Sequence, residues 1–320
     1  MKLSVCIPVY NCEKYIERCM RSLYAQTLAE IEFVFVDDCS TDGSFAEMER
    51  IAAECDPEKA RTKLIRLPAN RGRVGARFAA LEAASGDYVG FCDADDWVEP
   101  SCYAKLMAAA EREHADAAIC QYVDVAADGK YSSPRKVAFE CAEPTEFVAK
   151  SFYSPGFNSL CNKIFRTSLA KRWLADKMPD LCVGEDLLMT MRFLSRAKRL
   201  AFVNEPLYCY RKTDKSVSRE LSHRTISDMI SCIHRLSGEF SALPKPSLDV
   251  MRVHALWAAC RCRDFANDEI NDLVRTFDID FDGVRGVPAV KQRLLPWCKM
   301  NVSSARTAVR IVEFIRRFVA

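Results

Sequence analysis

Residues 86–100 read GDYVGFCDADDWVEP, a short apolar run that passes directly into acidic residues. The near-continuous apolar character from Asp87 to Cys92 predicts a strand that is covered on both faces, as in the middle of a parallel sheet. Asp93 and Asp95 follow at the carboxyl end of this strand. Ligands bind at that end of the strands in open α/β sheets, so the stretch predicts both a fold class and a site.

The negative charge of this acidic turn indicates what it could bind. Crowded carboxylates repel one another unless a cation or ligand hydroxyl groups engage them. Asp93 and Asp95 offer the oxygen ligands that suit Mg²⁺ or Mn²⁺ bound together with substrate phosphates. The alternative is a purely structural turn, with Asp96 or Glu99 near the N-terminus of the next helix.

The segments around this stretch alternate between strand-like and helix-like patterns. We expect strands at 2–9, 31–36, 63–67, 87–92 and 117–123. Helices are expected at about 11–24, 44–54 and 101–112 and directly after residue 72, the last with Val74, Phe78 and Leu81 facing inward. Alternation with short connections predicts an α/β fold with a mostly parallel sheet flanked by helices.

Polar residues follow the first four predicted strands, and the carboxyl ends of parallel strands share one edge. These residues are Tyr10, Asn11 and Glu13, then Asp37 and Asp38, then Asn70 and Arg71, then Asp93 and Asp95. Their coincidence at one edge predicts a pocket. No GxGxxG follows the first strand and no P-loop lysine motif occurs, so NAD and FAD are not expected. Asp38 can accept hydrogen bonds from a base or ribose hydroxyl, or form a turn with Asp37.

A second informative stretch is CVGEDLLMTMRFLSRA, residues 182–197. It predicts a helix that begins at Glu185 and Asp186, with Leu187, Leu188, Met191 and Leu194 facing a core. Acids in a first turn are favoured by the helix dipole alone. The functional interpretation is a general base held rigidly at the mouth of the pocket. Downstream, Arg211, Lys212 and Lys215 are either phosphate contacts or a solvated basic loop.

Composition excludes several classes of protein. The 320 residues have a net charge of +2, which gives no overall footprint for nucleic acid. Sixteen cysteines without a CxxC pair argue against a disulfide framework or a zinc site and favour a reducing compartment. The sequence opens on a strand rather than a signal peptide, and no run of about 18 apolar residues occurs.

Several motifs in order resemble the family 2 inverting glycosyltransferases with the GT-A fold. They are SVCIPVYNCEKYIERCMRSLYAQT, FVFVDDCSTDGS, NRGRVGARFAAL, GDYVGFCDADDW, NKIFRTSLA, GEDLLMTMRFL and LYCYRKTDKSVS. The resemblance covers roughly the first two thirds of the chain. It implies a nucleotide-sugar donor, usually a UDP-sugar, and a divalent cation, Mn²⁺ or Mg²⁺. Phe78, Ala80 and Cys39 depart from residues that are common in the family.

The resemblance also implies residue roles. Donor binding is implied for Pro8, Tyr10, Asn11, Glu13, Asp38, Asn70, Arg71, Arg77, Asp93 and Asp95. Asp93 and Asp95 match the DxD motif, with Asp95 the expected direct metal ligand. Asp186 matches the catalytic base, with Glu185 beside it. The implied reaction is inverting transfer to a hydroxyl of a glycan or lipid-linked acceptor, in bacterial cell-surface polysaccharide synthesis in the cytoplasm. The alternatives are an inactive nucleotide-binding module of the same fold and a nucleotidyltransferase.

Three regions are expected on this basis: a donor-binding half at 1–125, an acceptor-side half with the base at 126–220, and a helical region at 221–320. The last segment, ARTAVRIVEFIRRFVA, predicts a basic amphipathic helix. Arg306, Arg310, Glu313 and Arg317 share one face, and Ala308, Ile311, Val312, Ile315, Phe318 and Val319 share the other. Such a helix at 305–320 either makes peripheral contact with the inner membrane face or packs on protein.

Overall fold

The structure is a computed structural model that describes residues 1–58, 60–126, 128–132, 159–175, 181, 183–212, 221–240, 245–281 and 288–319. The chain falls into two compact units. The described residues of the first unit are those up to 175 together with 189–212. Those of the second unit are 181, 183–188 and everything described from 221 onward.

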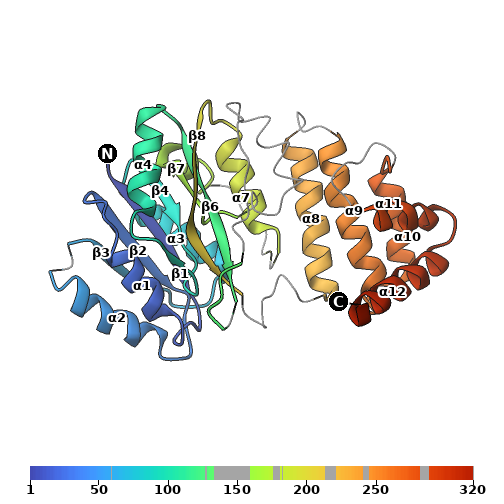
Figure 1. The fold of residues 1–320 in the computed structure, drawn as a ribbon, viewed down its shortest axis with the longest axis horizontal. Coiled ribbons are helices and arrows are strands. Elements are labelled where there is room, and N and C mark those ends of the chain that lie inside the picture. The colour runs from blue at the N-terminus through green and yellow to red at the C-terminus, as the bar shows by residue number, and fades with distance from the viewer. Residues whose placement is uncertain are drawn as a thin grey trace. The chain divides into compact units, whose positions relative to one another are not determined.

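The first unit is built on an eight-stranded sheet with the order β3-β2-β1-β4-β7-β6-β8-β5 (Figure 1). The strands are β1 (Leu3–Val9), β2 (Ile31–Asp37), β3 (Thr62–Arg66), β4 (Tyr88–Phe91), β5 (Trp97–Val98), β6 (Ala117–Val125), β7 (Lys163–Arg166) and β8 (Leu200–Arg211). Strands β1 and β2 are almost wholly buried, as expected for strands with helices on both faces.

The predicted α/β fold is confirmed, and the sheet is mixed. β1 pairs in parallel with β2 and with β4, β2 pairs in parallel with β3, and β6 pairs in parallel with β8. β7 runs antiparallel between β4 and β6 and was not expected to do so. Its end is fixed at the start of β4, where Thr167 donates its backbone N–H to the Asp87 carbonyl and its hydroxyl to the Gly86 carbonyl.

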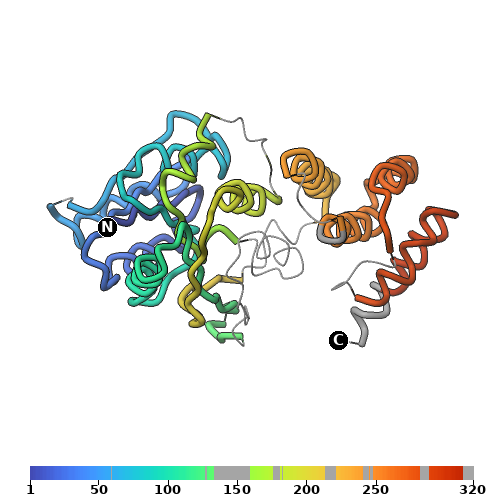
Figure 2. Tube along the Cα trace, turned by 90° about the horizontal axis from the view of Figure 1, so that it is seen from above, coloured from blue at the N-terminus to red at the C-terminus, as the bar shows by residue number. Residues whose placement is uncertain are grey.

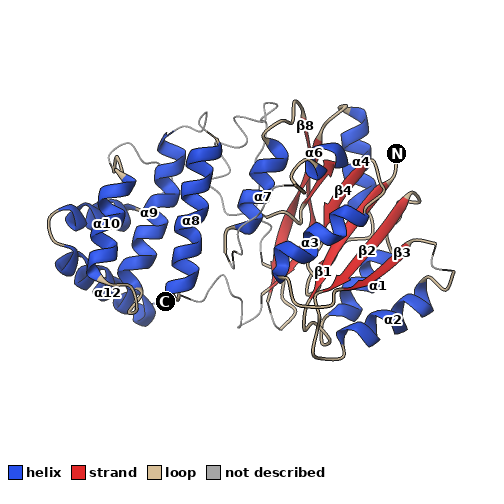
Figure 3. Cartoon of the chain, turned by 180° about the vertical axis from the view of Figure 1, so that it is seen from behind, coloured by secondary structure: helices blue, strands red, loops and turns tan. Residues whose placement is uncertain are grey.

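Helices cover both faces of the sheet (Figure 3). α1 (Ile16–Tyr24), α2 (Ser44–Cys55) and α4 (Cys102–Arg112) lie on one face, and α3 (Gly72–Ala83) and α6 (Thr167–Lys171) lie on the other. The apolar residues of α1 recur at helical spacing, and four of them, Ile16, Cys19, Met20 and Leu23, are buried. The inward face predicted for α3 is partly wrong. Val74 and Phe78 are only half-buried, while Ala76, Arg77 and Ala80 are buried. Small residues let α3 lie close to the sheet and leave room for a buried arginine.

α7 (Glu185–Leu194) begins at the acid pair, as predicted, and its four predicted apolar positions are buried. The Asp128-Gly129 dipeptide predicts a hairpin turn, and a turn is present there: Gly129 has φ +83°, and Val125 bridges Tyr131 in antiparallel fashion. The sequence also predicts a short extended piece at 136–139, which lies outside the described residues.

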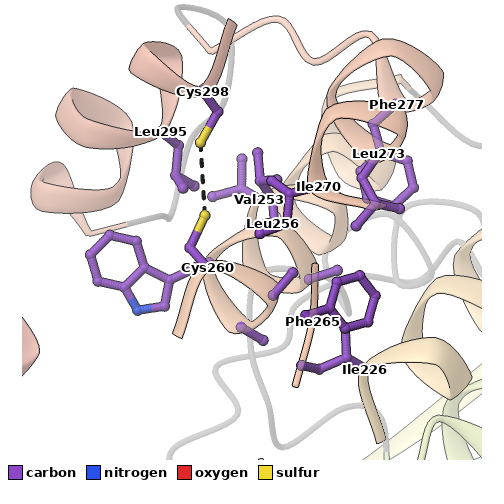
Figure 4. Close-up of a cluster of buried hydrophobic side chains, with 14 of the residues drawn as sticks. Ile226, Val253, Leu256, Cys260, Phe265, Ile270, Leu273, Phe277, Leu295 and Cys298 are labelled. Carbon is purple, nitrogen blue, oxygen red and sulfur yellow. Dashed lines mark hydrogen bonds between the residues drawn. The ribbon is translucent and has the colours of Figure 1, made fainter. Parts of the chain in front are cut away.

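The second unit is helical beyond residue 221, as predicted. Its helices are α8 (His223–Glu239), α9 (Lys245–Arg261), α10 (Asn267–Phe277), α11 (Ala289–Leu294), the 3₁₀ helix η3 (Leu295–Lys299) and α12 (Val302–Val319). α8 and α9 lie side by side (Figures 1 and 2). One apolar cluster holds the unit together, with Leu295 and Cys298 of η3 pointing into it beside Val253 and Leu256 of α9 (Figure 4).

The face predicted for the terminal helix is wrong in part. Val302, Ala305 and Val309 belong to the buried cluster, whereas Ile311 is 53% exposed. Arg306, expected on the polar face, is buried and donates hydrogen bonds to the Asn267 side chain and the Cys262 carbonyl. The beginning of α12 therefore packs on protein. Among the helices described, none is long and apolar enough to cross a membrane.

Candidate active site

The four parallel strands β1 to β4 end at one edge of the sheet, where polar residues follow each of them. Neighbouring register pairs such as Val9 with Asp37, and Asp37 with Arg66, place the ends of β1, β2 and β3 level with one another. β4 runs in the same direction beside β1 and leads into Asp93. We call this edge the strand-end site. It brings together the residues predicted at 10–13, 37–38, 70–71 and 93–95, and Pro8 lies half-buried before the end of β1.

The residues after β1 hold the next loop in place. Asn11, in the left-handed region at φ +51°, accepts a hydrogen bond from the Thr41 backbone N–H at 2.9 Å. Glu13 accepts one from the Gly43 N–H at 3.1 Å. A Cβ at position 43 would lie 2.6 Å from Glu13 Oε1, so the Glu13 carboxylate would have to move to admit a side chain there. Tyr10 is 47% exposed and presents its ring at this edge.

Asp37 and Asp38, for which the sequence left two interpretations open, make different contacts in the structure. Asp37 forms the turn, because its carboxylate accepts from the Ser40 N–H at 3.3 Å. Asp38 accepts from the Arg71 N–H at 2.7 Å and so fixes the loop after β3. Burial raises the pKa of Asp38. Asn70 accepts from the Gly72 N–H at 3.1 Å and opens α3, and the Arg71 side chain is exposed.

Asp93 is held by a buried cation. The Arg77 guanidinium is fully buried on α3 and donates to the Asp93 carboxylate at 2.9 Å. Burial alone would raise the pKa of Asp93, but Arg77 and the nearby Arg73 outweigh it and lower that pKa. Arg77, predicted among the donor-binding residues, therefore contacts Asp93 and orients its carboxylate.

Asp95, two residues further on, has a different environment. Its side chain is partly exposed, and burial together with the charge of Asp93 raises its pKa. A carboxylate whose charged form is disfavoured in this way is one that a bound cation would stabilise. Within the described ranges, no group of three His, Cys, Asp or Glu side chains is arranged to hold a metal.

Asp96 is fixed by β8, a connection that the sequence did not predict. Tyr208 donates its hydroxyl to the Asp96 carboxylate at 2.6 Å and accepts from the Asp93 N–H at 3.2 Å. The Arg211 N–H donates to the other Asp96 oxygen at 2.8 Å. The alternation of aromatic residues in PLYCYR was the available signal. Asp96 thus anchors the acidic turn to β8 rather than serving only the N-terminus of α4.

Arg211 also reaches the strand-end site with its side chain. Its Nε donates to the Asp95 carbonyl at 2.8 Å, and its guanidinium lies 5.0 Å from the Tyr15 ring and 5.1 Å from the Trp97 ring. These contacts hold a positive charge beside the acidic turn. Lys212, by contrast, pairs with Asp124 at 2.6 Å, and Lys215 lies outside the described residues.

Glu185 and Asp186 open α7 within the second unit. Gly184 precedes them at φ +93°, and its carbonyl accepts a hydrogen bond from the Cys232 thiol at 3.4 Å. Glu185 is buried, whereas Asp186 is partly exposed. At the start of α7, Asp186 is therefore more accessible to solvent than Glu185.

Comparison with known sequences shows which family of proteins this chain belongs to. The family described as "Glycosyl transferase family 2" matches residues 4–181, just over half of the chain. The chain belongs to this family. That region contains β1 to β4, α3 and both aspartates of the DxD motif.

Individual relatives match over about two thirds of the chain or slightly more. An uncharacterized glycosyltransferase of Bacillus subtilis, EpsJ, is 29% identical over 71% of this chain and 65% of its own length. The poly(ribitol-phosphate) beta-N-acetylglucosaminyltransferase TarS of Staphylococcus aureus is 32% identical over 66% of this chain and 35% of its own. The matches thus span less than two thirds of each of these two relatives.

Solved structures share the fold over nearly the whole chain. Residues 1–349 of Staphylococcus aureus TarS, crystallised with UDP-GlcNAc, superpose with a TM-score of 0.73 and 23% identity over 98% of this chain and 92% of that one. A Pyrobaculum calidifontis mannosyltransferase with GDP-Man and Mn²⁺ gives 0.58 and 16% identity over 97% and 86%. This chain therefore has the GT-A fold with a helical C-terminal region.

Proposed function

We propose that this protein is an inverting glycosyltransferase that moves a sugar from a UDP-sugar to a hydroxyl of a glycan or lipid-linked acceptor. Membership of the family and the GT-A fold support this class of reaction. UDP is the favoured nucleotide because the TarS relative binds UDP-GlcNAc. A place in bacterial cell-surface polysaccharide synthesis is proposed from relatives such as the succinoglycan biosynthesis protein ExoO of Rhizobium meliloti.

The proposal rests mainly on one observation, that the two DxD carboxylates have different environments. Arg77 holds Asp93 ionised in one orientation, while Asp95 is left partly exposed with a raised pKa. In a turn with only a structural role, a second carboxylate whose charged form is disfavoured would not contribute to stability. A diphosphate-bound cation would satisfy it, since Mg²⁺ and Mn²⁺ bind through one or two carboxylates plus phosphate oxygens.

The residues present fit such a cation, with Asp95 as the direct ligand and Asp93 as its neighbour. When bound, Mn²⁺ or Mg²⁺ would neutralise charge that develops on the leaving diphosphate. Arg211, fixed against Asp95 and two aromatic rings, would add a positive charge from the protein itself. Tyr10 and Asp38 would contact the nucleoside, and Asn11, Glu13 and Asn70 would shape the loops around it.

Asp186 is proposed as the general base. A sugar hydroxyl is a poor nucleophile, so a carboxylate must take its proton as the oxygen attacks the anomeric carbon. The new bond forms opposite the breaking bond to the phosphate oxygen, UDP leaves with that electron pair, and the anomeric centre inverts. The transition state has oxocarbenium character, as in glycoside hydrolysis. Glu185, buried beside Asp186, would keep the helix start in place.

The test replaces Asp186 with Asn and measures donor binding and sugar transfer separately. We expect UDP affinity to stay within about twofold and transfer to fall by at least about 100-fold, the usual contribution of a general base. Asp268→Asn removes an exposed acid from the first turn of α10 and is the matched control. Transfer by Asp186→Asn at the rate of this control would overturn the assignment. Incorporation of nucleotide in place of sugar would instead indicate a nucleotidyltransferase.

We further propose that residues 288–320 place the enzyme on an anionic membrane surface. This segment carries seven Lys and Arg and a single Glu, a net charge of +6, while residues 1–287 carry −4. Trp297 and Met300 are 46% and 80% exposed, although Leu295 and Cys298 of the same turn point into the core. Exposed apolar side chains among basic residues are typical of interfacial anchors. The reduced cysteines of the described residues fit a reducing, cytoplasmic side.

Vesicle sedimentation tests this anchor. The double variant Trp297→Ser/Met300→Ser is compared with Tyr131→Ser, which removes a 55% exposed aromatic residue from the first unit. We expect the double variant to bind vesicles of phosphatidylglycerol and phosphatidylcholine at least about fivefold less than the control, because interfacial binding scales with the apolar area buried. Equal sedimentation of the two variants would contradict the anchor.

A further inference from the structure

A second cavity lies at the sheet edge opposite the strand-end site. It is formed where α6 ends and where α7 leads into β8. β7 ends at Arg166 opposite Tyr88, the first residue of β4, so α6 begins beside the start of β4. Asp93 follows the other end of that strand. At about 3.3 Å per residue, the six residues from Asp87 to Asp93 separate the two edges by about 20 Å.

The cavity has two adjoining parts within the first unit. One has a volume of about 280 Å³ and is lined by Leu169, Arg172, Trp173, Arg192, Phe193 and Arg196. The other, of about 480 Å³, shares Leu169, Arg172 and Arg196 and adds Asp116, Ser168 and Lys198. We call the whole the arginine groove. Its total size suits a phosphate group with a sugar- or glycerol-sized substituent.

The charge of the described lining of the arginine groove is strongly positive. Arg172, Arg196 and Lys198 are exposed around it, and Asp116, the one carboxylate among its described lining residues, is already engaged. Asp116 accepts a hydrogen bond from the Lys198 backbone N–H at 2.7 Å and from the Arg166 side chain at 3.1 Å. Cations on one small surface repel one another, so an arrangement of this kind is stabilised when an anion binds.

The wall of the groove is rigid and aromatic. The Trp173 indole N–H donates to the Arg192 carbonyl at 2.8 Å, which ties the turn after α6 to α7. The Arg192 guanidinium lies 5.0 Å from the Trp173 ring. Phe193 is buried beneath and packs on Phe165 with ring centroids 5.2 Å apart. The Trp173 turn is therefore held in place before any ligand arrives.

We propose that the arginine groove is a second ligand site, for a phosphate-bearing molecule other than the sugar donor. Guanidinium groups match phosphate with two parallel hydrogen bonds, and arginine is preferred where such recognition matters. Arg172 and Arg196 would hold the phosphate, Lys198 would add charge, and the Trp173 ring would cover the substituent. The site stands independently of the reaction at the strand-end site, because the two lie on opposite edges of the sheet.

The test titrates inorganic pyrophosphate into the full chain in a calorimeter with EDTA and no divalent cation, because pyrophosphate chelates Mn²⁺ and the strand-end site is proposed to need that ion. The variant Arg172→Gln/Arg196→Gln is compared with Arg112→Gln/Arg275→Gln, which removes two exposed arginines of surface ion pairs. We expect the groove variant to bind pyrophosphate at least about tenfold more weakly than the control, because it loses the charge-assisted hydrogen bonds that two arginines make to phosphate. Equal affinities in the two variants, or no binding to the unaltered chain, would overturn the proposal.

A second arm identifies the source of the phosphate. Short-chain phosphatidylglycerol, below its micelle concentration, is titrated beside glycerol 3-phosphate. Tighter binding of the lipid, lost in the groove variant, assigns the groove to a lipid headgroup. Equal binding of both, lost in the groove variant, assigns it to a soluble phosphate. Retention of either ligand by the groove variant at the control's affinity counts against the site.

Discussion

Asp93 keeps its charge at the strand-end site because Arg77 faces it from inside the protein. The two groups are 2.9 Å apart, and the arginine is fully buried. Removing one member of such a pair leaves the other charge poorly compensated, which is far more costly than removing both. The pair is therefore a requirement of the folded state as well as of the site.

We predict that Arg77→Met lowers the free energy of unfolding by about 3 kcal/mol at pH 7. Asp93→Asn alone should also destabilise the protein, and the double variant should be more stable than the sum of the two effects predicts. Urea denaturation of the four proteins gives the coupling energy. Additive effects, within about 0.5 kcal/mol, would show that the two side chains do not depend on each other.

The sequence predicted both aspartates of this site but not their surroundings. Asp93 and Asp95 are separated only by Ala94 in a recognisable turn, so their pattern is local. Arg77 lies on α3, and Tyr208 and Arg211 lie on β8, more than 100 residues away. Contacts of this kind depend on the packing of distant segments, which a single sequence does not display.

At the scale of elements, Glu32 joins three segments near the start of the sheet. Its carboxylate on β2 accepts hydrogen bonds from Lys2 Nζ at 2.7 Å, from the Ser4 hydroxyl at 2.5 Å and from the Ser85 N–H at 2.6 Å. Burial alone would raise the pKa of Glu32, but these hydrogen bonds outweigh it and lower that pKa far below its usual range. The stabilisation is therefore complete above the unfolded-state pKa of about 4.3 and is lost as the pH falls below it.

We predict that Glu32→Gln lowers the free energy of unfolding by about 1–3 kcal/mol at pH 7, since buried partners lose their charged acceptor. The unaltered protein should lose more stability between pH 6 and about pH 3 than the variant does, because only the unaltered protein must protonate Glu32. Denaturant unfolding at both pH values measures the difference. Parallel pH profiles for the two proteins would contradict the role of Glu32.

The start of α7 depends on Gly184. Its φ of +93° is unfavourable for other residues, and a Cβ there would meet the Cys232 Cβ at 3.0 Å. We predict that Gly184→Ala destabilises the fold by about 1–3 kcal/mol. Gly238→Ala, in α8 with open space around it, should be neutral or stabilising by up to about 1 kcal/mol. If thermal unfolding midpoints of the two variants agree, the backbone at position 184 is not constrained as described.

Elements with strong local patterns were predictable, and those set by distant pairing were not. β1, β2 and α2 follow clear patterns, and their observed bounds lie close to those expected. α1 ends where expected but begins at Ile16 rather than at about 11, because the chain forms a turn closed by the Tyr15 N–H on the Cys12 carbonyl. β8 was missed because its exposed middle and Pro206 break the strand pattern, where the pairing with β6 also shifts register. β5 has only two residues, too few for any periodicity.

At the scale of the whole molecule, charge is distributed unevenly along the chain, which the small net charge does not reveal. A chain with +2 overall carries +6 in its last 33 residues. The sequence predicted a basic amphipathic helix there, yet the first turns of α12 are buried against their own unit. The exposed apolar residues lie instead in η3, because a 3₁₀ turn sends Leu295 inward and leaves Trp297 outward. Periodicity analysis of α12 could not reveal this.

The central claim is that the strand-end site binds a nucleotide diphosphate together with a divalent cation through Asp95. Calorimetric titration of UDP, first with Mn²⁺ and then with EDTA, tests it most directly. Asp95→Ala is compared with Asp128→Ala, which removes an exposed acid from a hairpin turn. We predict that UDP binds in Mn²⁺ only, and that affinity falls at least about tenfold in Asp95→Ala but not in the control. Binding of UDP that is unaffected by EDTA and by Asp95→Ala, or its absence in Mn²⁺, would contradict the claim.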